Sequence, residues 1–148
     1  AVLRIAGDGP ERLALERKRQ SLGLNDAVEL LGAIGPAELR DELQLCDLFA
    51  LATRNEALGV AIMEAMAMER PIIASNVGGV PELIKHNITG KLVPADSPHS
   101  IAKETAWIKA NKREARRMGR LARQQVQEQF SIRANSKELL NMIDTHAT

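Results

Sequence analysis

Two glutamates, Glu56 and Glu64, stand eight positions apart in the stretch RNEALGVAIMEAMA, residues 54–67. Between them lies Gly59, near the start of an apolar helix expected over residues 58–68. A carboxylate at Glu64, on a run that is otherwise apolar, must find hydrogen-bond donors or be desolvated at a cost in free energy. Two acids that frame the start of such a helix indicate a binding site.

The start of this helix has the chemistry of an anion site. The first amides of a helix have no partner within it, and a helix N-terminus carries a positive charge of about half a unit. A diphosphate can bind such amides, here those of Leu58, Gly59 and Val60. Gly59 would let the anion approach because it has no side chain. Glu64 is suited to bind a ribose, since carboxylates in dinucleotide-binding sheets often accept hydrogen bonds from ribose hydroxyls. Glu56 is suited to bind a further polyol, such as a sugar.

A purely structural interpretation of these residues stays open. Glu64 would then face solvent or a neighbouring basic residue, and Glu56 would complement the helix dipole. GDGP, residues 7–10, is a common strand-to-helix turn. In SNVGGVPE, residues 75–82, the paired glycines allow the chain to run close to a ligand cleft, and Glu82 either lines that cleft or caps a short helix.

Composition argues against several classes of protein. The 148 residues suffice for one domain with its own core, and the net charge of +1 draws the chain to neither nucleic acid nor membrane. Phe49, Trp107 and Phe130 are too few aromatic residues for a single-stranded nucleic-acid platform. The lone Cys46 fits a reducing cytoplasm. No stretch approaches the roughly 20 apolar residues that span a bilayer, and the histidines lack the spacing of metal ligands.

Strand and helix patterns alternate along most of the chain. Short apolar runs between Gly, Pro and Asp predict strands at residues 2–6, 27–32, 47–52, 71–75 and 90–94. Capping signals and helical spacing predict helices at residues 10–22, 36–45, 58–68 and 80–85. The segment from about 98 to 145 is predicted to be helical, with Ser97 and Ser131 as helix caps. Because the first residues already have the pattern of a core strand, we expect that an N-terminal part of a larger protein has been removed.

This alternation predicts an α/β fold. We expect a Rossmann-like parallel sheet with helices on both faces, in a single domain over residues 1–148. Ligands in such sheets bind outside the carboxyl ends of the strands, in the loops that lead into helices. The loops at those ends are GDGP, GAIGP, ATRNEALG and SNVGGVPE.

An ordered set of motifs carries a resemblance to a known family. GDGPER, ELLG and CDLFALATRNEALGVAIMEAMAMERPIIASNVGGVPELIKHNITGKLV follow one another as in the C-terminal half of the family 4 (group 1) retaining glycosyltransferases. The centre of the likeness is the E-x7-E motif from Glu56 to Glu64. The resemblance implies the donor-binding domain of a nucleotide-sugar-dependent enzyme with the GT-B fold. Such an enzyme transfers a sugar from a nucleoside diphosphate to a hydroxyl of a glycan, a lipid-linked acceptor or a small molecule, as in polysaccharide biosynthesis.

The family's functional residues carry over position by position. Glu56 is similar to the residue that contacts the transferred sugar and is the implied catalytic residue, and Glu64 corresponds to the ribose-binding residue. Amides at 58–60 would take the distal phosphate or sugar, the loop at 32–34 would border the base, and residues 8–9 would border the cleft. The donor-binding residues that the resemblance implies are therefore Asp8, Gly9, Gly32, Ala33, Ile34, Glu56, Leu58, Gly59, Val60 and Glu64.

The resemblance also implies the partners of the protein. The co-substrate would be a UDP- or GDP-linked sugar, with no metal and no other cofactor. The family's phosphate-binding Arg and Lys and its acceptor domain lie upstream of Ala1, so this chain alone is expected to bind donor weakly and to transfer nothing. We expect a cytoplasmic location. The basic segment 109–123 is either a solvated helix face or a peripheral contact with the inner face of the membrane.

Two positions depart from the family pattern. Thr53 replaces a serine and keeps its hydroxyl, whereas Glu69 replaces a glycine after the 58–68 helix, where a left-handed residue other than glycine costs about 1 kcal/mol.

Two functional alternatives stay open. A Rossmann-like or receiver-type module without transfer activity would need neither Glu56 nor Glu64, and a GT-B epimerase relative would want further catalytic acids in the cleft.

Overall fold

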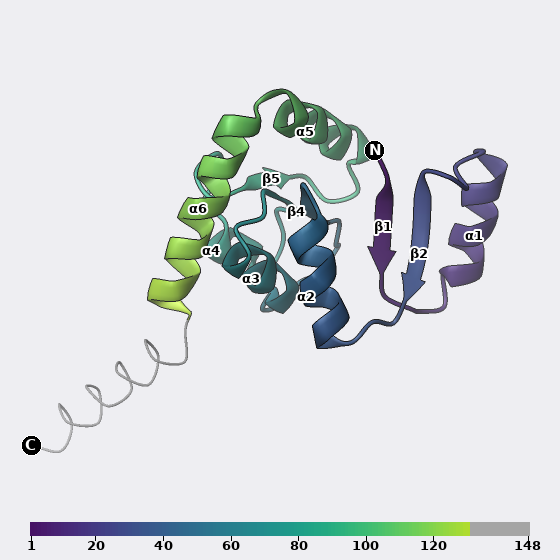
Figure 1. Ribbon diagram of the computed structural model, residues 1–148, viewed down its shortest axis with the longest axis horizontal. Coiled ribbons are helices and arrows are strands. Elements are labelled where there is room, and N and C mark those ends of the chain that lie inside the picture. Colours follow the sequence, from purple (N-terminus) through teal and green to yellow (C-terminus); the bar gives the residue numbers. More distant parts are fainter. Residues whose placement is uncertain (131–148) are drawn as a thin grey trace, which may run out of the picture. The chain divides into compact units, whose positions relative to one another are not determined.

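The computed structural model of the protein describes residues 1–130. These fall into two compact units, Ala1–Glu42 and the part of the chain from Leu43 onward. Strands and helices alternate in both units (Figure 1), so the predicted α/β class is confirmed. The last helix predicted from Ser131 lies outside the described residues.

The first unit holds a two-stranded parallel sheet. β1 (Leu3–Ala6) pairs with β2 (Val28–Gly32), and α1 (Arg12–Ser21) connects the two strands. The register shifts at the carboxyl end of β1, where the strand leads into the GDGP turn. α2 (Pro36–Leu45) begins in this unit, at the proline that favours a first helical turn.

β1 is more exposed than its apolar sequence predicts. Leu3 is 53% exposed, and Ile5 is the one half-buried residue of the strand. α1 has no buried residue, and its Leu13 is 65% exposed. Within this unit, the strand predicted at residues 2–6 therefore forms over Leu3–Ala6 without the burial of a core strand. A sheet of two strands with one crossover helix has too little surface to bury its apolar side chains.

The second unit holds a three-stranded parallel sheet in the order β3, β4, β5. Its strands are β3 (Phe49–Leu51), β4 (Ile72–Ser75) and β5 (Lys91–Val93). Every residue of the central β4 is buried, as expected for a strand that is covered on both faces. β3 is shorter than the strand predicted at 47–52, because its pairing with β4 covers three residues.

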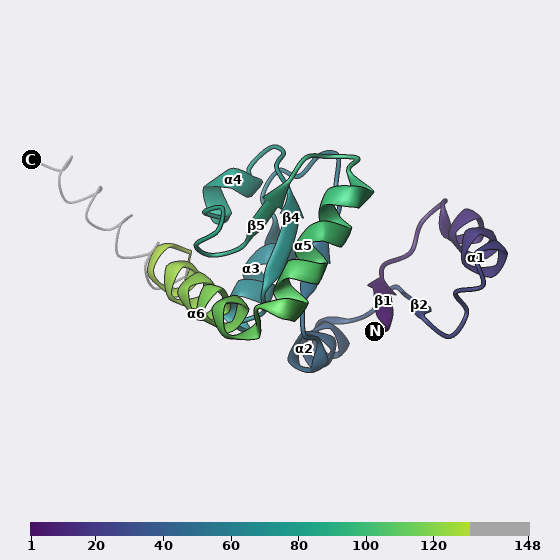
Figure 2. The ribbon, with the colours of Figure 1, turned by 90° about the horizontal axis from the view of Figure 1, so that it is seen from above.

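Helices pack on both sides of this sheet. α3 (Val60–Ala67) and α5 (Pro98–Ala110) both contact β4 and lie on opposite sides of it (Figures 1 and 2). α4 (Val80–Leu83) is a single turn between β4 and β5, and α6 (Lys112–Gln129) packs along α3. Ser97 occupies the predicted N-cap position of α5, but its hydroxyl donates to Ser100 Oγ at 2.7 Å and caps no backbone amide.

α6 approaches the end of α3 closely enough to require a glycine. A Cβ at Gly119 would lie 2.2 Å from the carbonyl oxygen of Glu69. Glu69 has φ 57°, so the left-handed backbone predicted at this non-glycine residue is confirmed. The Glu69 carboxylate accepts a hydrogen bond from Arg123 Nη1 at 3.2 Å. The buried stripe of α6 is Ala115, Met118, Gly119, Ala122, Gln125 and Val126, which leaves the bases of this helix on its exposed side.

Candidate functional site

Gly59 sets the start of α3. Its left-handed backbone (φ 68°, ψ 43°) ends the preceding loop, so the helix begins at Val60, two residues later than predicted. A Cβ at Gly59 would also lie 2.7 Å from Leu83 Cδ1. The left-handed backbone therefore favours glycine here, whereas the sequence suggests only the approach of an anion.

The Glu56 side chain lies at the amides that were predicted to hold a phosphate. Its Oε1 accepts the Gly59 N–H at 2.8 Å and the Leu58 N–H at 3.3 Å. The carboxylate therefore complements the positive end of the α3 dipole, as the structural interpretation of this residue expects. An anion that binds these amides must first displace the carboxylate.

Glu64 lies on the second turn of α3 and is half-buried. Its carboxylate has no hydrogen bond and no ion pair with any side chain or amide in residues 1–130. The interpretation that pairs Glu64 with a basic neighbour is therefore not supported within this part of the chain. A half-buried carboxylate without a protein donor is able to accept ligand hydroxyls.

The loop between β3 and α3 is held by hydrogen bonds to its neighbours. The Thr53 N–H donates to Ser75 Oγ at 3.1 Å, at the end of β4. The Thr53 hydroxyl donates to the Asn55 carbonyl at 2.8 Å and closes a local turn, so the hydroxyl kept at this position has a structural use. Arg54 pairs with Asp96 at 2.8 Å on the surface. These contacts fix the approach of the chain to Glu56.

The paired glycines of SNVGGVPE contact this same loop. The Gly79 N–H donates to the carbonyl oxygen of Glu56 at 3.0 Å. The sequence predicts only that these glycines run close to a ligand cleft, and no local pattern indicates that they contact the backbone at Glu56. Glu82, in the first turn of α4, is exposed.

The first unit places the other predicted residues at the carboxyl ends of its two strands. Asp8 and Gly9 line a cavity of about 290 Å³, and Asp8 Oδ1 accepts the Gly9 N–H at 2.8 Å. Gly32 is buried with φ 74°, and its carbonyl accepts the Gly7 N–H at 2.7 Å. The loop at 33–34 continues from Gly32. Both predicted loops of this unit therefore lie at the ligand-binding edge of its sheet.

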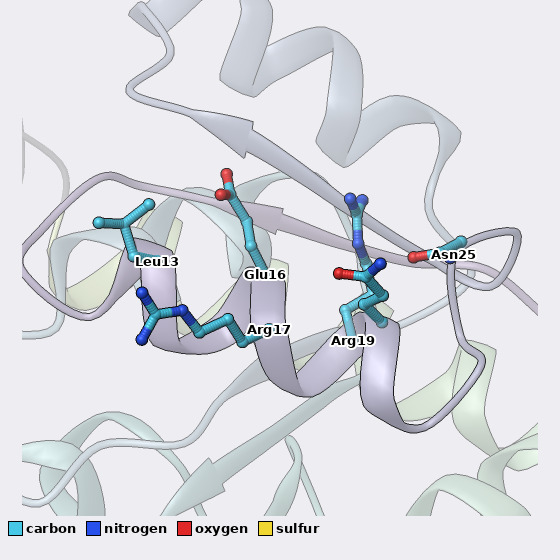
Figure 3. A pocket seen from close by; sticks show the side chains of 6 residues that line it. Leu13, Glu16, Arg17, Arg19 and Asn25 are labelled. Carbon is cyan, nitrogen blue, oxygen red and sulfur yellow. The ribbon is translucent and has the colours of Figure 1, made fainter.

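A larger cavity of about 520 Å³ lies in the same unit, along α1 and the loop before β2 (Figure 3). Arg19, on its wall, donates to the Val28 carbonyl at 3.2 Å, and Glu16 pairs with Arg12 at 3.1 Å. None of the predicted site residues lines this cavity. Its walls are formed by Leu13, Glu16, Arg17, Arg19, Gln20 and Asn25.

Cys46 lies outside the candidate site, just before β3. Its Sγ is 3.5 Å from the Leu43 carbonyl oxygen. Burial raises the pKa of the Cys46 thiol, and the nearby Arg70 guanidinium opposes that rise. A protonated, half-buried thiol is a packing residue and a poor nucleophile.

Residues 1–130 contain no cluster of three His, Cys, Asp or Glu side chains placed to bind a metal ion. The same residues contain no helix with the length and apolar character needed to cross a bilayer.

Comparison with known sequences identifies a family and its members that resemble this chain. Residues 1–125 match the family described as glycosyl transferases group 1. N-acetyl-alpha-D-glucosaminyl L-malate synthase of Bacillus anthracis is 32% identical over 145 residues. The match covers 98% of this chain and 36% of that protein, so the chain spans little more than a third of its relative's length.

Solved structures share the fold. HepE of Anabaena, in complex with UDP, gives a TM-score of 0.88 at 23% identity, over 97% of this chain and 41% of HepE. The C-terminal domain of LpcC, a glycosyl transferase group 1 family protein of Francisella tularensis, gives 0.75 at 24% identity, over 82% of this chain and 63% of that one. At such identities the likeness shows the fold alone, that of GT-B C-terminal domains. Since the family match covers most of the chain and the fold agrees with it, this protein belongs to the group 1 glycosyl transferases.

Proposed function

We propose that this chain is the donor-binding domain of a retaining glycosyltransferase, which moves a sugar from a nucleoside diphosphate to an acceptor hydroxyl. Family membership supports glycosyl transfer. The observation that carries the assignment of the site is Glu64, a half-buried acid on α3 with no protein partner in residues 1–130. Such a carboxylate suits the two hydroxyls of a ribose.

The diphosphate would bind at the start of α3. The amides of Leu58, Gly59 and Val60 lie at the positive end of the helix dipole, and Glu56 accepts hydrogen bonds from two of them. When the diphosphate arrives, it takes these amides, and the released carboxylate turns to the hydroxyls of the sugar. The exchange of one anion for another keeps the amides hydrogen-bonded throughout, which avoids the cost of unsatisfied donors.

Of the remaining predicted residues, the loop after β2 is assigned to the base, and Asp8 and Gly9 to the border of the cleft. Asp8 and Gly9, together with Gly32, Ala33 and Ile34, lie at the carboxyl edge of the first unit's sheet, where nucleotides bind in parallel α/β proteins. HepE, with the same fold, was solved with UDP and with UDP-glucose. We therefore propose a UDP- or GDP-linked sugar as the co-substrate and assign no metal to the site.

In the transfer step, the bond between the anomeric carbon and the diphosphate oxygen breaks. The acceptor oxygen bonds to that carbon, and the acceptor's proton is released. Negative charge grows on the leaving diphosphate, where the amides of α3 stabilise it. Glu56 is the proposed catalytic residue of this chain, because its carboxylate would contact the sugar as the charge develops.

The acceptor, a glycan or a lipid, would be bound by the rest of the full-length enzyme, in the cytoplasm and in polysaccharide biosynthesis. The exposed bases of α6 suit a peripheral contact with an anionic membrane. Co-sedimentation with phosphatidylglycerol vesicles tests this contact, and its absence at low salt would remove the membrane from the proposal.

Calorimetric titration with UDP, GDP and UDP-glucose tests the donor site. Glu64→Ala is expected to weaken binding of the nucleotide by about tenfold, because a charge-assisted hydrogen bond to ribose is lost. Glu128→Ala, which removes an exposed acid on α6, is the matched control and is expected to bind as the wild type does. A wild-type chain that binds neither UDP nor GDP at millimolar concentration overturns the proposal. If Glu64→Ala binds normally, the chain is a nucleotide-binding module of another kind.

A further inference from the structure

The segment after β4 lies against the backbone of the loop that carries Glu56. In addition to the hydrogen bond from the Gly79 N–H to the Glu56 carbonyl, the two segments are in direct contact. A Cβ at Gly78 would lie 2.1 Å from the Glu56 carbonyl oxygen, and a Cβ at Gly79 would lie 2.3 Å from the Ala57 carbonyl oxygen. Two successive carbonyls of the loop therefore rest on backbone that has no room for a side chain.

The beginning of the loop is fixed by the same segment. Ser75, which is 2% exposed at the end of β4, accepts the Thr53 N–H through its hydroxyl. Ser75, Gly78 and Gly79 thus hold the loop at Thr53, Glu56 and Ala57. These contacts are made to backbone atoms, so they fix the position of Glu56 but leave its side chain free to rotate.

We infer that Gly78 and Gly79 are positioning residues for Glu56. This inference rests on the proposed function, in which the Glu56 carboxylate exchanges its helix amides for sugar hydroxyls. Such an exchange needs a mobile side chain on a fixed backbone. The glycine pair supplies the fixed backbone, because it is the only part of the described second unit that both bonds to the Glu56 peptide and packs against it.

A side chain at Gly79 would move the loop by a predictable amount. Ordinary contact begins at 3.4 Å, so a Cβ at 2.3 Å from the Ala57 oxygen requires a shift of about 1 Å. Gly79 has φ −77°, so alanine fits its backbone without strain and the displacement is the main effect. A misplacement of this size is expected to weaken contacts to the sugar by about tenfold or more.

Gly119→Ala is a matched control for Gly79→Ala. Its Cβ would meet a backbone carbonyl at 2.2 Å, almost the same distance, but at the other end of α3, beside Glu69. Both variants are expected to lower the melting temperature. Only Gly79→Ala is expected to weaken UDP-glucose binding by about tenfold, while UDP, which lacks the sugar, stays within about threefold of the wild type. GDP-mannose and GDP replace these probes if the wild type binds only GDP.

A thermodynamic cycle separates positioning from general destabilisation. In the Glu56→Ala background no carboxylate remains to be positioned, so Gly79→Ala is expected to change UDP-glucose affinity by less than about twofold. A loss that persists in full in this background overturns the inference. So does a Gly79→Ala protein that folds and binds UDP-glucose as the wild type does.

A milder variant covers the case in which Gly79→Ala does not fold. Ser75→Ala removes the acceptor of the Thr53 N–H without adding atoms, and it is expected to weaken UDP-glucose binding by about threefold, again only when Glu56 is present. Equal binding by Ser75→Ala and wild type would then overturn the inference. A wild type that binds no nucleotide is a different result, since it removes the proposed function itself.

Discussion

At the scale of single residues, Glu56 connects stability to binding. Its carboxylate closes the first turn of α3 by accepting the amides of Leu58 and Gly59, a task usually performed by the side chain of a cap residue. Gly59 cannot perform it, because it has no side chain. The residue that the proposal assigns to the sugar is therefore also needed by the fold.

Substitution of Glu56 is expected to destabilise the ligand-free protein. Glu56→Ala should lower the free energy of unfolding by about 1 kcal/mol, because the first amides of α3 lose their acceptor. Glu56→Gln keeps an oxygen at this position and should lose about half as much, since only the charge is removed. Urea denaturation measures both values. Equal stability of Glu56→Ala and wild type would contradict a capping role.

Cys46 predicts how stability depends on pH. Burial raises the pKa of its thiol, so the folded protein keeps the proton to a higher pH than the unfolded chain does. Below the ordinary thiol pKa both states are protonated, and this contribution to stability is fully present. As the pH rises above about 8.5, the unfolded chain ionises first and the contribution is lost.

The measurement is the free energy of unfolding in urea between neutral and alkaline pH. Wild type should lose stability over this range more steeply than Cys46→Ala, in which no thiol titrates. Parallel curves for the two proteins would show that the thiol has the same pKa in the folded and unfolded states.

Part of the candidate site was predictable at this scale, and part was not. Glu56 and Glu64 are recognisable from their spacing, and the structure leaves Glu64 without a partner in residues 1–130. The contact between Gly79 and Glu56 was not predictable. It joins segments more than twenty positions apart through backbone atoms, which have no signature in the sequence. The packing of the Leu83 side chain against Gly59 was not predictable either, because it joins residues more than twenty positions apart.

At the scale of elements, Lys91 ties β5 to α5. Its side chain is 8% exposed, and its Nζ donates to Asn87 Oδ1 at 2.8 Å. The same Nζ lies 3.2 Å from Glu104 Oε2 and 3.7 Å from the centre of the Trp107 ring. A buried cation with an acid and an aromatic face on the neighbouring helix fixes that helix against the sheet.

Removal of this cation is expected to be costly. Lys91→Ala should lower the free energy of unfolding by about 3 kcal/mol, because it leaves the largely buried Glu104 carboxylate unpaired. The double variant Lys91→Met, Glu104→Leu should stay within about 1 kcal/mol of the wild type, since no buried charge remains. Chemical denaturation compares the two. A double variant as unstable as Lys91→Ala would contradict this account of the pair.

The order of the elements was predictable, because glycine and proline punctuate the chain. Each strand predicted up to residue 94 and each helix up to residue 129 has a counterpart in the structure. The ends of elements were less predictable, since pairing with β4 limits β3 to three residues. The burial of Lys91 was not predictable from the strand pattern, because its partner Glu104 lies on another element.

At the scale of the whole molecule, the chain covers 36% of its Bacillus anthracis relative and 41% of HepE. The proposed reaction also needs an acceptor and further cations at the diphosphate. We therefore predict that the 148-residue chain binds UDP-glucose without releasing its sugar. The rate of UDP release, measured by a coupled assay, should equal that of a buffer blank. Release above the blank that Glu56→Ala abolishes would show that this chain is catalytically sufficient.

The carboxylate on the α3 amides also sets a threshold for competing ions. Because Glu56 is tethered three residues from Gly59, its effective concentration at these amides is on the order of millimolar or higher. A free sulfate or phosphate ion replaces the carboxylate only if it binds these amides more favourably than the tethered group does. In the proposed site, a nucleotide sugar would overcome the tether because its base, ribose and sugar bring the diphosphate in with them. The Glu56 side chain would thus make the proposed site bind a phosphate group more readily within a larger ligand than as a free ion.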